Sequence, residues 1–233
     1  RTAHSQSEAR AMINKTPAVS VIIPTHNRPD RLRTAITSVL DQDFQDFQII
    51  VVNDGTTSAE AVVADLNRDG RIILVTHDRN RGLAASRNTG LRQASGKYVC
   101  YLDDDDRLLP HHLRTLVTHL ESTGDKIAYT DAWRVHERLI DHTVTEVGRD
   151  QPYSEDFNPH QLLISNYLPV LCLMHERAIL DEVGTFDESL FAHEDWDLWI
   201  RMATKYPFKH LAVTTAEFTW RTDGSSMSSE SKD

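Results

Sequence analysis

Four consecutive aspartates, Asp103 to Asp106, are the strongest chemical signal in this 233-residue sequence. They directly follow an apolar run at residues 98–102 (YVCYL). Adjacent carboxylates repel one another and are costly to bury unpaired, so a divalent cation would stabilise them. Carboxylate oxygens are hard ligands that suit Mg²⁺ or Mn²⁺. A solvated acidic turn, or Asp106 capping the next helix, is the simpler alternative, but the position at the end of a strand favours a metal.

A second acidic segment, His193 to Trp199 (HEDWDLW), combines three carboxylates with two tryptophans. A transfer reaction needs a base beside the acceptor hydroxyl, and a sugar ring stacks well on an aromatic face. An amphipathic helix with acidic residues in its first turn and tryptophans in the core would give the same pattern. The spacing alone favours that simpler interpretation.

Two further segments contain residues that suit a nucleotide site. Asn53-Asp54-Gly55 supplies the backbone angles of a turn, and this is its simplest explanation, although Asp54 would also accept a hydrogen bond from a nucleotide base. In residues 80–90 (NRGLAASRNTG), Gly82 permits close backbone approach and Arg87 could face phosphate oxygens or an aspartate of the site. Close helix–sheet packing through the small residues explains residues 80–90 equally well.

The twelve histidines raise the question of zinc. No HExxH spacing occurs, and His111 and His112 are adjacent, so they cannot share one face of a helix. We therefore expect surface histidines rather than a zinc site.

The elements that must position these residues alternate between strand and helix. Short runs rich in β-branched residues predict strands, and apolar spacings of three and four predict helices. The expected strands cover residues 19–24, 47–52, 71–76 and 98–102, and the expected helices cover residues 29–40, 58–67, 83–93 and 110–122. This alternation predicts an α/β fold with a mostly parallel sheet flanked by helices on both faces. Ligands of such sheets bind at the carboxyl ends of the strands, where the polar clusters lie.

The sequence after residue 130 is less regular. Residues 141–159 are polar, which predicts a mobile loop. Residues 166–175 contain a strand-like apolar stretch, and residues 194–204 have a helical pattern. Residues 1–17 lack an apolar period and are interpreted as a tail or linker.

Composition limits the class of partner and the compartment. A net charge of −10 argues against nucleic acid. The apolar runs are far shorter than the roughly 20 residues that cross a bilayer, and no signal-like leader is visible. Cys100 lies in an apolar run and is expected to be a core thiol, which fits a cytoplasmic location, including the inner face of a membrane. Because residue 1 is arginine, we expect a processed or excised chain, and membrane association or further domains of a longer parent are compatible with it.

Taken in order, six segments resemble the GT-A family 2 glycosyltransferases, the large inverting group. They are VSVIIPTHNRPDRL, IIVVNDGTT, NRGLAASRNTGL, GKYVCYLDDDDRLLP, VGTFDESL and HEDWDLWIRM, and they span residues 19–228 with their surroundings. The resemblance implies a GT-A (Rossmann-like) fold with a smaller acceptor-side subregion. It also implies that residues 18–130 bind a nucleotide sugar, and that residues 131–233 bind the acceptor, supply the catalytic base and end in a flexible segment.

The resemblance implies roles for the donor side. Thr25 and Asp54 would hold the nucleotide base, and Asp103 would contact the ribose or base region. The donor-binding residues implied in this way are Thr25, Asn27, Asp54, Arg87, Asp103 and Asp104.

It also implies the metal and acceptor sites. Asp105 would coordinate Mn²⁺ or Mg²⁺ at the diphosphate. Many relatives carry a second, histidine ligand where this chain has Asp223, a hard oxygen donor that would replace it, and residues 225–228 would cover the bound donor. Asp195 would be the general base, and Glu194 and Trp196 would shape the acceptor pocket.

The expected function is metal-dependent, inverting transfer of a sugar from a nucleotide-diphosphate donor, with a UDP-sugar favoured, to a hydroxyl of a glycan or other acceptor. The expected setting is polysaccharide or glycoconjugate biosynthesis. A sugar-nucleotide nucleotidyltransferase is an alternative, but it would need a glycine-rich, lysine-bearing loop after the first strand, and residues 24–28 (PTHNR) are not one. The other alternative is a catalytically silent domain that binds nucleotide sugars.

Overall fold

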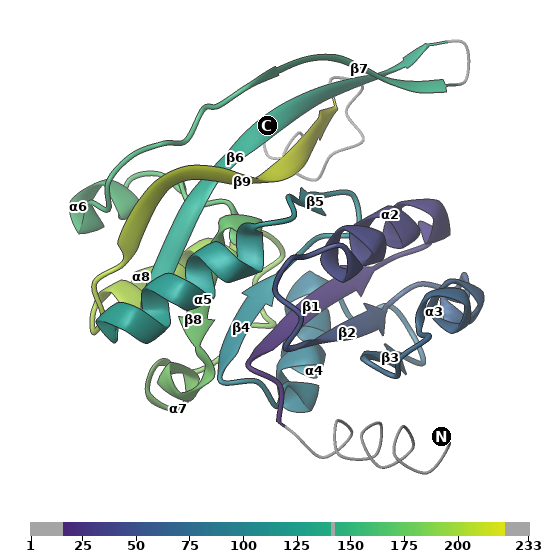
Figure 1. Cartoon of the computed structure of the whole chain (residues 1–233), viewed down its shortest axis with the longest axis horizontal. Coiled ribbons are helices and arrows are strands. Elements are labelled where there is room, and N and C mark those ends of the chain that lie inside the picture. Colours follow the sequence, from purple (N-terminus) through teal and green to yellow (C-terminus); the bar gives the residue numbers. More distant parts are fainter. Residues whose placement is uncertain (1–15, 141–142, 222–233) are drawn as a thin grey trace, which may run out of the picture.

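The computed structural model describes residues 16–140 and 143–221. One nine-stranded sheet has the strand order β3-β2-β1-β4-β8-β6-β9-β5, and β7 pairs with β6 off this path. Figure 1 shows helices on both sides of the sheet. The first four strands are parallel, β6 and β9 are parallel, and β8 runs antiparallel to both of its neighbours. The predicted α/β architecture is confirmed.

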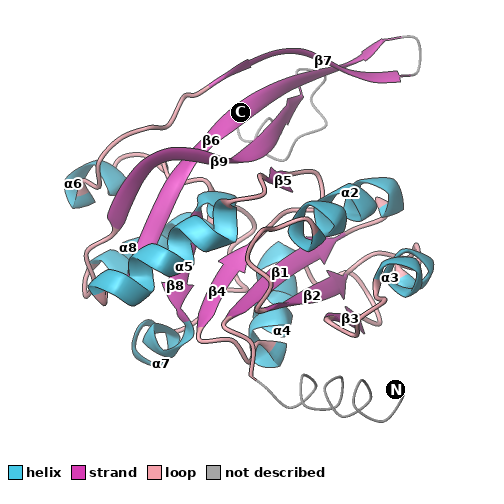
Figure 2. Cartoon of the chain, viewed as in Figure 1, coloured by secondary structure: helices cyan, strands magenta, loops and turns pink. Residues whose placement is uncertain are grey.

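The elements, coloured by type in Figure 2, have the following bounds. The strands are β1 (Val19–Thr25), β2 (Phe47–Asn53), β3 (Ile72–Thr76), β4 (Tyr98–Tyr101), β5 (Arg107–Leu108), β6 (Ile127–Ile140), β7 (Thr143–Asp150), β8 (Leu173–Glu176) and β9 (Lys209–Arg221). The helices are α2 (Pro29–Leu40), α3 (Glu60–Leu66), α4 (Leu83–Gln93), α5 (His112–Thr123), α6 (Pro159–Leu162), α7 (Leu180–Val183) and α8 (Glu194–Ala203), with 3₁₀ turns η1 (Val170–Cys172) and η2 (Arg177–Ile179). Within the described ranges, no helix is long and apolar enough to cross a membrane.

Strand β1 shows how the sheet acquires two buried faces. Val21 and Ile23 belong to a hydrophobic cluster with α2, α3 and α5, whereas Ile22 belongs to a second cluster with α4 and α8. Successive side chains of a strand point to opposite faces, so an unbroken apolar run needs cover on both. Gly90 lets α4 approach closely, because a Cβ atom there would lie 2.4 Å from Cγ2 of Ile22.

The bounds predicted for the first half agree with the structure to within two residues, and α8 was also predicted correctly. The prediction of a loop at residues 141–159 is wrong for residues 143–150, which form β7. All but the last residue of β7 are exposed, so the strand lacks the apolar alternation that marks a half-buried strand. Residues 166–175 contain a strand only from Leu173, because η1 precedes it. The proposed division at residue 130 falls inside β6 and stays a prediction about function.

The expectation that the histidines lie on the surface is wrong for His112 and His175, which are fully buried. In His175, Nδ1 donates to the carbonyl of Glu176 at 2.8 Å, and Nε2 accepts from the Tyr101 hydroxyl at 2.9 Å. Both ring nitrogens therefore have partners when the imidazole is neutral. Burial lowers the pKa of His175 from 6.5 to about 4. Burial is compatible with histidine here because the neutral form is satisfied.

This burial predicts a loss of stability in mild acid. The unfolded chain binds a proton at His175 below pH 6.5 and the folded chain does not, so the stability is present above pH 6.5 and is lost as the pH falls toward 4. Between pH 7.5 and pH 5 the wild type should lose about 2 kcal/mol more unfolding free energy than His175→Gln. Urea unfolding of both proteins at both pH values measures this difference. Identical pH dependence would contradict the prediction.

Candidate active site

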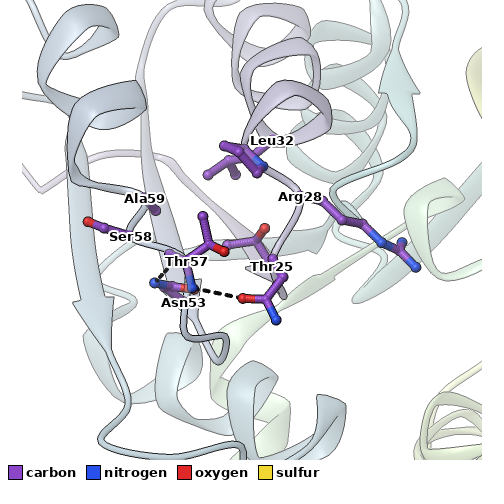
Figure 3. Close-up of a pocket in the computed structure, with 9 residues that line it drawn as sticks. Thr25, Arg28, Leu32, Asn53, Thr57, Ser58 and Ala59 are labelled. Carbon is purple, nitrogen blue, oxygen red and sulfur yellow. Dashed lines mark hydrogen bonds between the residues drawn. The ribbon is translucent and has the colours of Figure 1, made fainter.

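A small pocket opens at the carboxyl ends of β1 and β2 (Figure 3). Its lining residues are Thr25, Asn27, Arg28, Pro29, Leu32, Asn53, Thr57, Ser58 and Ala59. Two asparagines hold the loop after β2, since Asn53 Nδ2 donates to the Thr57 carbonyl at 3.0 Å and Asn27 Oδ1 accepts from Thr57 N–H at 2.8 Å. Asn27 thus shapes this pocket, and its contact with a donor stays a prediction.

The turn after β2 requires glycine for steric reasons. A Cβ atom at Gly55 would lie 2.5 Å from Oδ1 of Asn27. Asn27 itself has a left-handed backbone (φ 57°), which asparagine adopts more readily than most residues. The two loops are therefore fitted to each other, with Asn53 at the end of β2 and Asp54 and Gly55 in the loop that follows.

Asp54 orders the loop between β3 and α4. Its Oδ1 accepts from the backbone N–H of Arg81 at 2.8 Å, and its Oδ2 accepts from that of Gly82 at 2.8 Å. The His77 ring completes the cluster, with Nδ1 2.7 Å from Asp54 Oδ1 and Nε2 2.9 Å from the Thr89 hydroxyl. The carboxylate is buried, so its hydrogen bonds fix the start of α4. Contact between Asp54 and a nucleotide base stays a prediction.

The four aspartates after β4 point to different partners. Asp103 Oδ1 accepts from Arg87 Nη2 at 2.8 Å, and Asp104 Oδ2 accepts from the Thr25 hydroxyl at 2.7 Å. Asp105 Oδ2 lies 3.0 Å from Arg28 Nη1. Asp106 is buried, and its Oδ1 accepts from a backbone N–H of β9 at 2.9 Å. The run is neither a solvated turn nor a helix cap.

Arginines balance the charge of this run. Arg28, from the start of α2, also lies 3.5 Å from Asp104, and Arg221, at the end of β9, lies 3.4 Å from Asp105. Burial and the neighbouring carboxylates together raise the pKa of Asp104 to about 6, against the lowering effects of Thr25 and Arg28. Burial and Asp103 also raise the pKa of Asp105. The carboxylates therefore gain from any further positive charge that reaches them.

Arg87 joins the aspartate run to the start of α8. Its Nη2 binds Asp103, and its Nη1 lies 2.5 Å from Oε1 of Glu194. Only 2% of Arg87 is exposed. Burial lowers the pKa of its guanidinium, but Asp103, Glu194 and Asp195 raise it by more, so the net shift is upward. Arg87 therefore faces an aspartate of the site, as predicted, and its contact with phosphate oxygens stays a prediction.

Asp195 lies in the first turn of α8, directly after Glu194. Its Oδ2 accepts from Asn166 Nδ2 at 3.2 Å, and its Oδ1 accepts from the backbone N–H of Trp196 at 2.7 Å. Trp196 is half-buried, and its indole N–H donates to the Leu162 carbonyl. Both carboxylate oxygens of Asp195 are held while the side chain stays partly open, which suits a base that must meet a substrate. Glu194 faces Arg87, and its acceptor role stays a prediction.

Among the described residues, no three His, Cys, Asp or Glu side chains are grouped so as to hold a metal on their own. A hard cation bound to a diphosphate needs fewer protein ligands, because phosphate oxygens and waters supply the rest. The side chains of Asp103 and Asp105 keep 32% and 22% of their area exposed. These residues fit a metal that binds together with the diphosphate. Asp223 and residues 225–228, also predicted for this region, lie outside the described residues.

Residues 20–160 match the family model described as glycosyl transferase family 2. The chain belongs to glycosyltransferase family 2. The enzyme is 30% identical over 213 residues to the uncharacterized glycosyltransferase YwdF of Bacillus subtilis, covering 91% of this chain and 78% of that one. It is 28% identical over 199 residues to the putative colanic acid biosynthesis glycosyl transferase WcaA of Escherichia coli, covering 83% of this chain and 69% of that one.

Solved structures share the GT-A fold of this glycosyltransferase. Residues 1–349 of S. aureus TarS in complex with UDP-GlcNAc match with a TM-score of 0.70 and 21% identity. The mannosyltransferase PcManGT from Pyrobaculum calidifontis, in complex with GDP-Man and Mn²⁺, matches with a TM-score of 0.67 and 17% identity. The matches cover 92% and 95% of this chain but only 61% and 65% of those chains.

Several residues of this candidate site were not predicted from the sequence. They are Arg28, His77, Asn166, Thr219 and Arg221. Arg28 had a usable signal, because it follows β1 at the edge of the sheet where ligands bind. His77 had the same signal, because it directly follows β3. Asn166, Thr219 and Arg221 reach the site through pairings distant in sequence, and no local pattern identifies them.

Proposed function

We propose that this glycosyltransferase is a metal-dependent, inverting enzyme that transfers a sugar from a nucleoside diphosphate sugar, with a UDP-sugar favoured, to a hydroxyl acceptor in polysaccharide or glycoconjugate biosynthesis. The observation that carries the proposal is the Arg87 bridge. It joins Asp103, on the donor side, to Glu194, which directly precedes the proposed base Asp195. Structures of the same fold in complex with UDP-GlcNAc or with GDP-Man and Mn²⁺ support a nucleotide-sugar donor.

The donor would lie along the carboxyl ends of the parallel strands. The base would lie near the loops that follow β1 and β2, and Asp103 and Asp105 follow the neighbouring strand β4. A divalent cation held by Asp105 and the diphosphate would offset the negative charge of the leaving group. Arg28 lies beside Asp105 and would add a second positive charge there.

Asp195 would act from the acceptor side. Its carboxylate takes the proton of the acceptor hydroxyl while the hydroxyl oxygen attacks the anomeric carbon and the nucleoside diphosphate departs. One displacement inverts the anomeric centre and needs no covalent enzyme intermediate. Asn166 holds one carboxylate oxygen of Asp195, and the backbone N–H of Trp196 holds the other. Asp195 itself lies in the first turn of α8.

A donor panel tests this function. UDP-glucose, UDP-galactose, UDP-GlcNAc and GDP-mannose are incubated with the enzyme in Mn²⁺ and in EDTA, and released nucleotide and the anomer of any transferred sugar are measured. We expect release from a UDP-sugar in Mn²⁺, none in EDTA, and an inverted anomer. Retention of configuration would contradict the mechanism. Nucleotide binding without turnover of any donor would favour the catalytically silent domain.

Asp105→Asn is expected to weaken UDP binding in Mn²⁺ by at least about tenfold, because one metal ligand loses its charge. In EDTA the affinities of the variant and the wild type for UDP should agree, since no metal links the carboxylate to the nucleotide. Isothermal titration with UDP in both solutions measures this. Equal weakening in EDTA would show that Asp105 acts through folding or direct contact rather than through a metal.

A further inference from the structure

Large apolar side chains are exposed on both chain segments that adjoin Asp195. Phe191 is 98% exposed, four residues before this aspartate, and Leu190 is 37% exposed. On the second segment, Ile164 is 81% exposed and Leu163 is 62% exposed. Four exposed large apolar side chains on the two segments that adjoin one carboxylate indicate an apolar contact.

Hydrogen bonds attach the second segment to α8. The indole N–H of Trp196 donates to the carbonyl of Leu162, and Asn166 donates to Asp195. Leu163 and Ile164 lie between these two anchors in the sequence, and α6 packs against α8. Figure 1 shows both helices at the same end of the molecule. Together, Leu163, Ile164, Leu190 and Phe191 form what we call the apolar rim.

We propose that the acceptor carries an apolar group next to its reactive hydroxyl, and that the apolar rim binds this group. The inference rests on the proposed function, in which the acceptor hydroxyl must come within hydrogen-bond reach of Asp195. Any substituent near that hydroxyl then meets the segments on either side of the base. An alkyl chain or an aromatic aglycone would each bury the apolar side chains of the rim.

A second copy of the chain is a weaker occupant for this surface. A stable protein interface buries roughly 800 Å² on each partner and uses 20 to 30 residues a side. The apolar rim offers only four side chains on two short segments. The chemistry of the rim therefore matches a substrate group rather than a protein surface.

Paired glycosides test the proposal. Octyl and methyl β-glycosides of glucose, galactose and N-acetylglucosamine, below micelle-forming concentrations, are titrated into the enzyme with UDP and Mn²⁺. Phenyl glycosides are a third arm that distinguishes an aromatic group from an alkyl chain. We expect at least one octyl or phenyl glycoside to bind about tenfold more tightly than its methyl counterpart. In Phe191→Ser and Leu163→Ser this preference should fall to about twofold or less.

Leu139→Ser is the matched control, because Leu139 is also 62% exposed but lies on β6. It should keep the wild-type preference. Equal binding of all glycosides to the wild type, or an unchanged preference in Phe191→Ser, would overturn the proposal. A dimer that Phe191→Ser dissociates in sedimentation would assign the rim to a second copy and also overturn it. UDP binding in Mn²⁺ is measured on the same samples. If the wild type does not bind UDP, the proposed function itself is contradicted; if it binds UDP but shows no glycoside preference, only the apolar-rim proposal is.

Discussion

Asp195→Asn is expected to lower the rate of sugar transfer by roughly 10²- to 10⁴-fold, the usual contribution of a general base. The amide has nearly the same shape as the carboxylate, and its single oxygen can still accept from the backbone N–H of Trp196, while the hydrogen bond from Asn166 is lost. It cannot take the proton of an acceptor hydroxyl at neutral pH. Because the proposed donor site lies at the ends of β1, β2 and β4, affinity for UDP should stay close to that of the wild type. Steady-state transfer kinetics and UDP titration measure the two effects.

Asp197→Asn is the control for this substitution. Asp197 lies on the same helix, but its carboxylate pairs with Arg201 of that helix, at 2.7 Å. Loss of this half-exposed ion pair should cost at most about 1 kcal/mol of stability and little activity. If Asp195→Asn transferred sugar as fast as Asp197→Asn, another residue would have to be the base.

The first half of the fold could be predicted because its strands are buried on both faces. Runs such as residues 19–24 and 47–52 are rich in β-branched residues and fully buried, and the helix between them carries one apolar face. The second half could not be predicted in the same way. Strand β9 is only partly buried and β7 is exposed, so neither shows a clear pattern. Backbone pairing with β6 holds both strands, and that information is not local.

The candidate site also contains residues that the sequence could predict and residues that it could not. The acids were identifiable, because Asp103 to Asp106 directly follow a buried strand. Of their partners, Arg87 was predicted to face an aspartate of the site, as observed. Arg28 and Arg221 were not identified, although Arg28 follows β1 at the edge where ligands bind, and Arg221 follows the aspartates by more than a hundred residues. Four adjacent carboxylates suggested a shared cation, whereas in the fold each carboxylate has its own hydrogen-bond or arginine partner. The sequence correctly predicted that positive groups or hydrogen bonds must offset the four carboxylates. Which residues supply them depends on the tertiary structure.

Arg87→Met is expected to reduce the free energy of unfolding by about 3–5 kcal/mol, the usual cost of removing one partner from a buried ion pair. The substitution leaves Glu194 buried without its guanidinium and leaves Asp103 without the donor at 2.8 Å. Urea unfolding measures the loss. Wild-type stability in Arg87→Met would show that water or another cation replaces the guanidinium.

The double variant Arg87→Met/Glu194→Gln separates stability from catalysis. Because the buried carboxylate is now neutral, much of the lost unfolding free energy should return. The transfer rate should not return, since Asp103 and the first turn of α8 are no longer joined by one rigid side chain, and a displacement of about 1 Å between donor and base is costly. We expect kcat to stay reduced by about 100-fold, with a smaller change in KM for the donor. Recovery of both stability and kcat would mean that Arg87 only neutralises Glu194, whereas recovery of stability alone identifies it as the residue that positions the base against the donor.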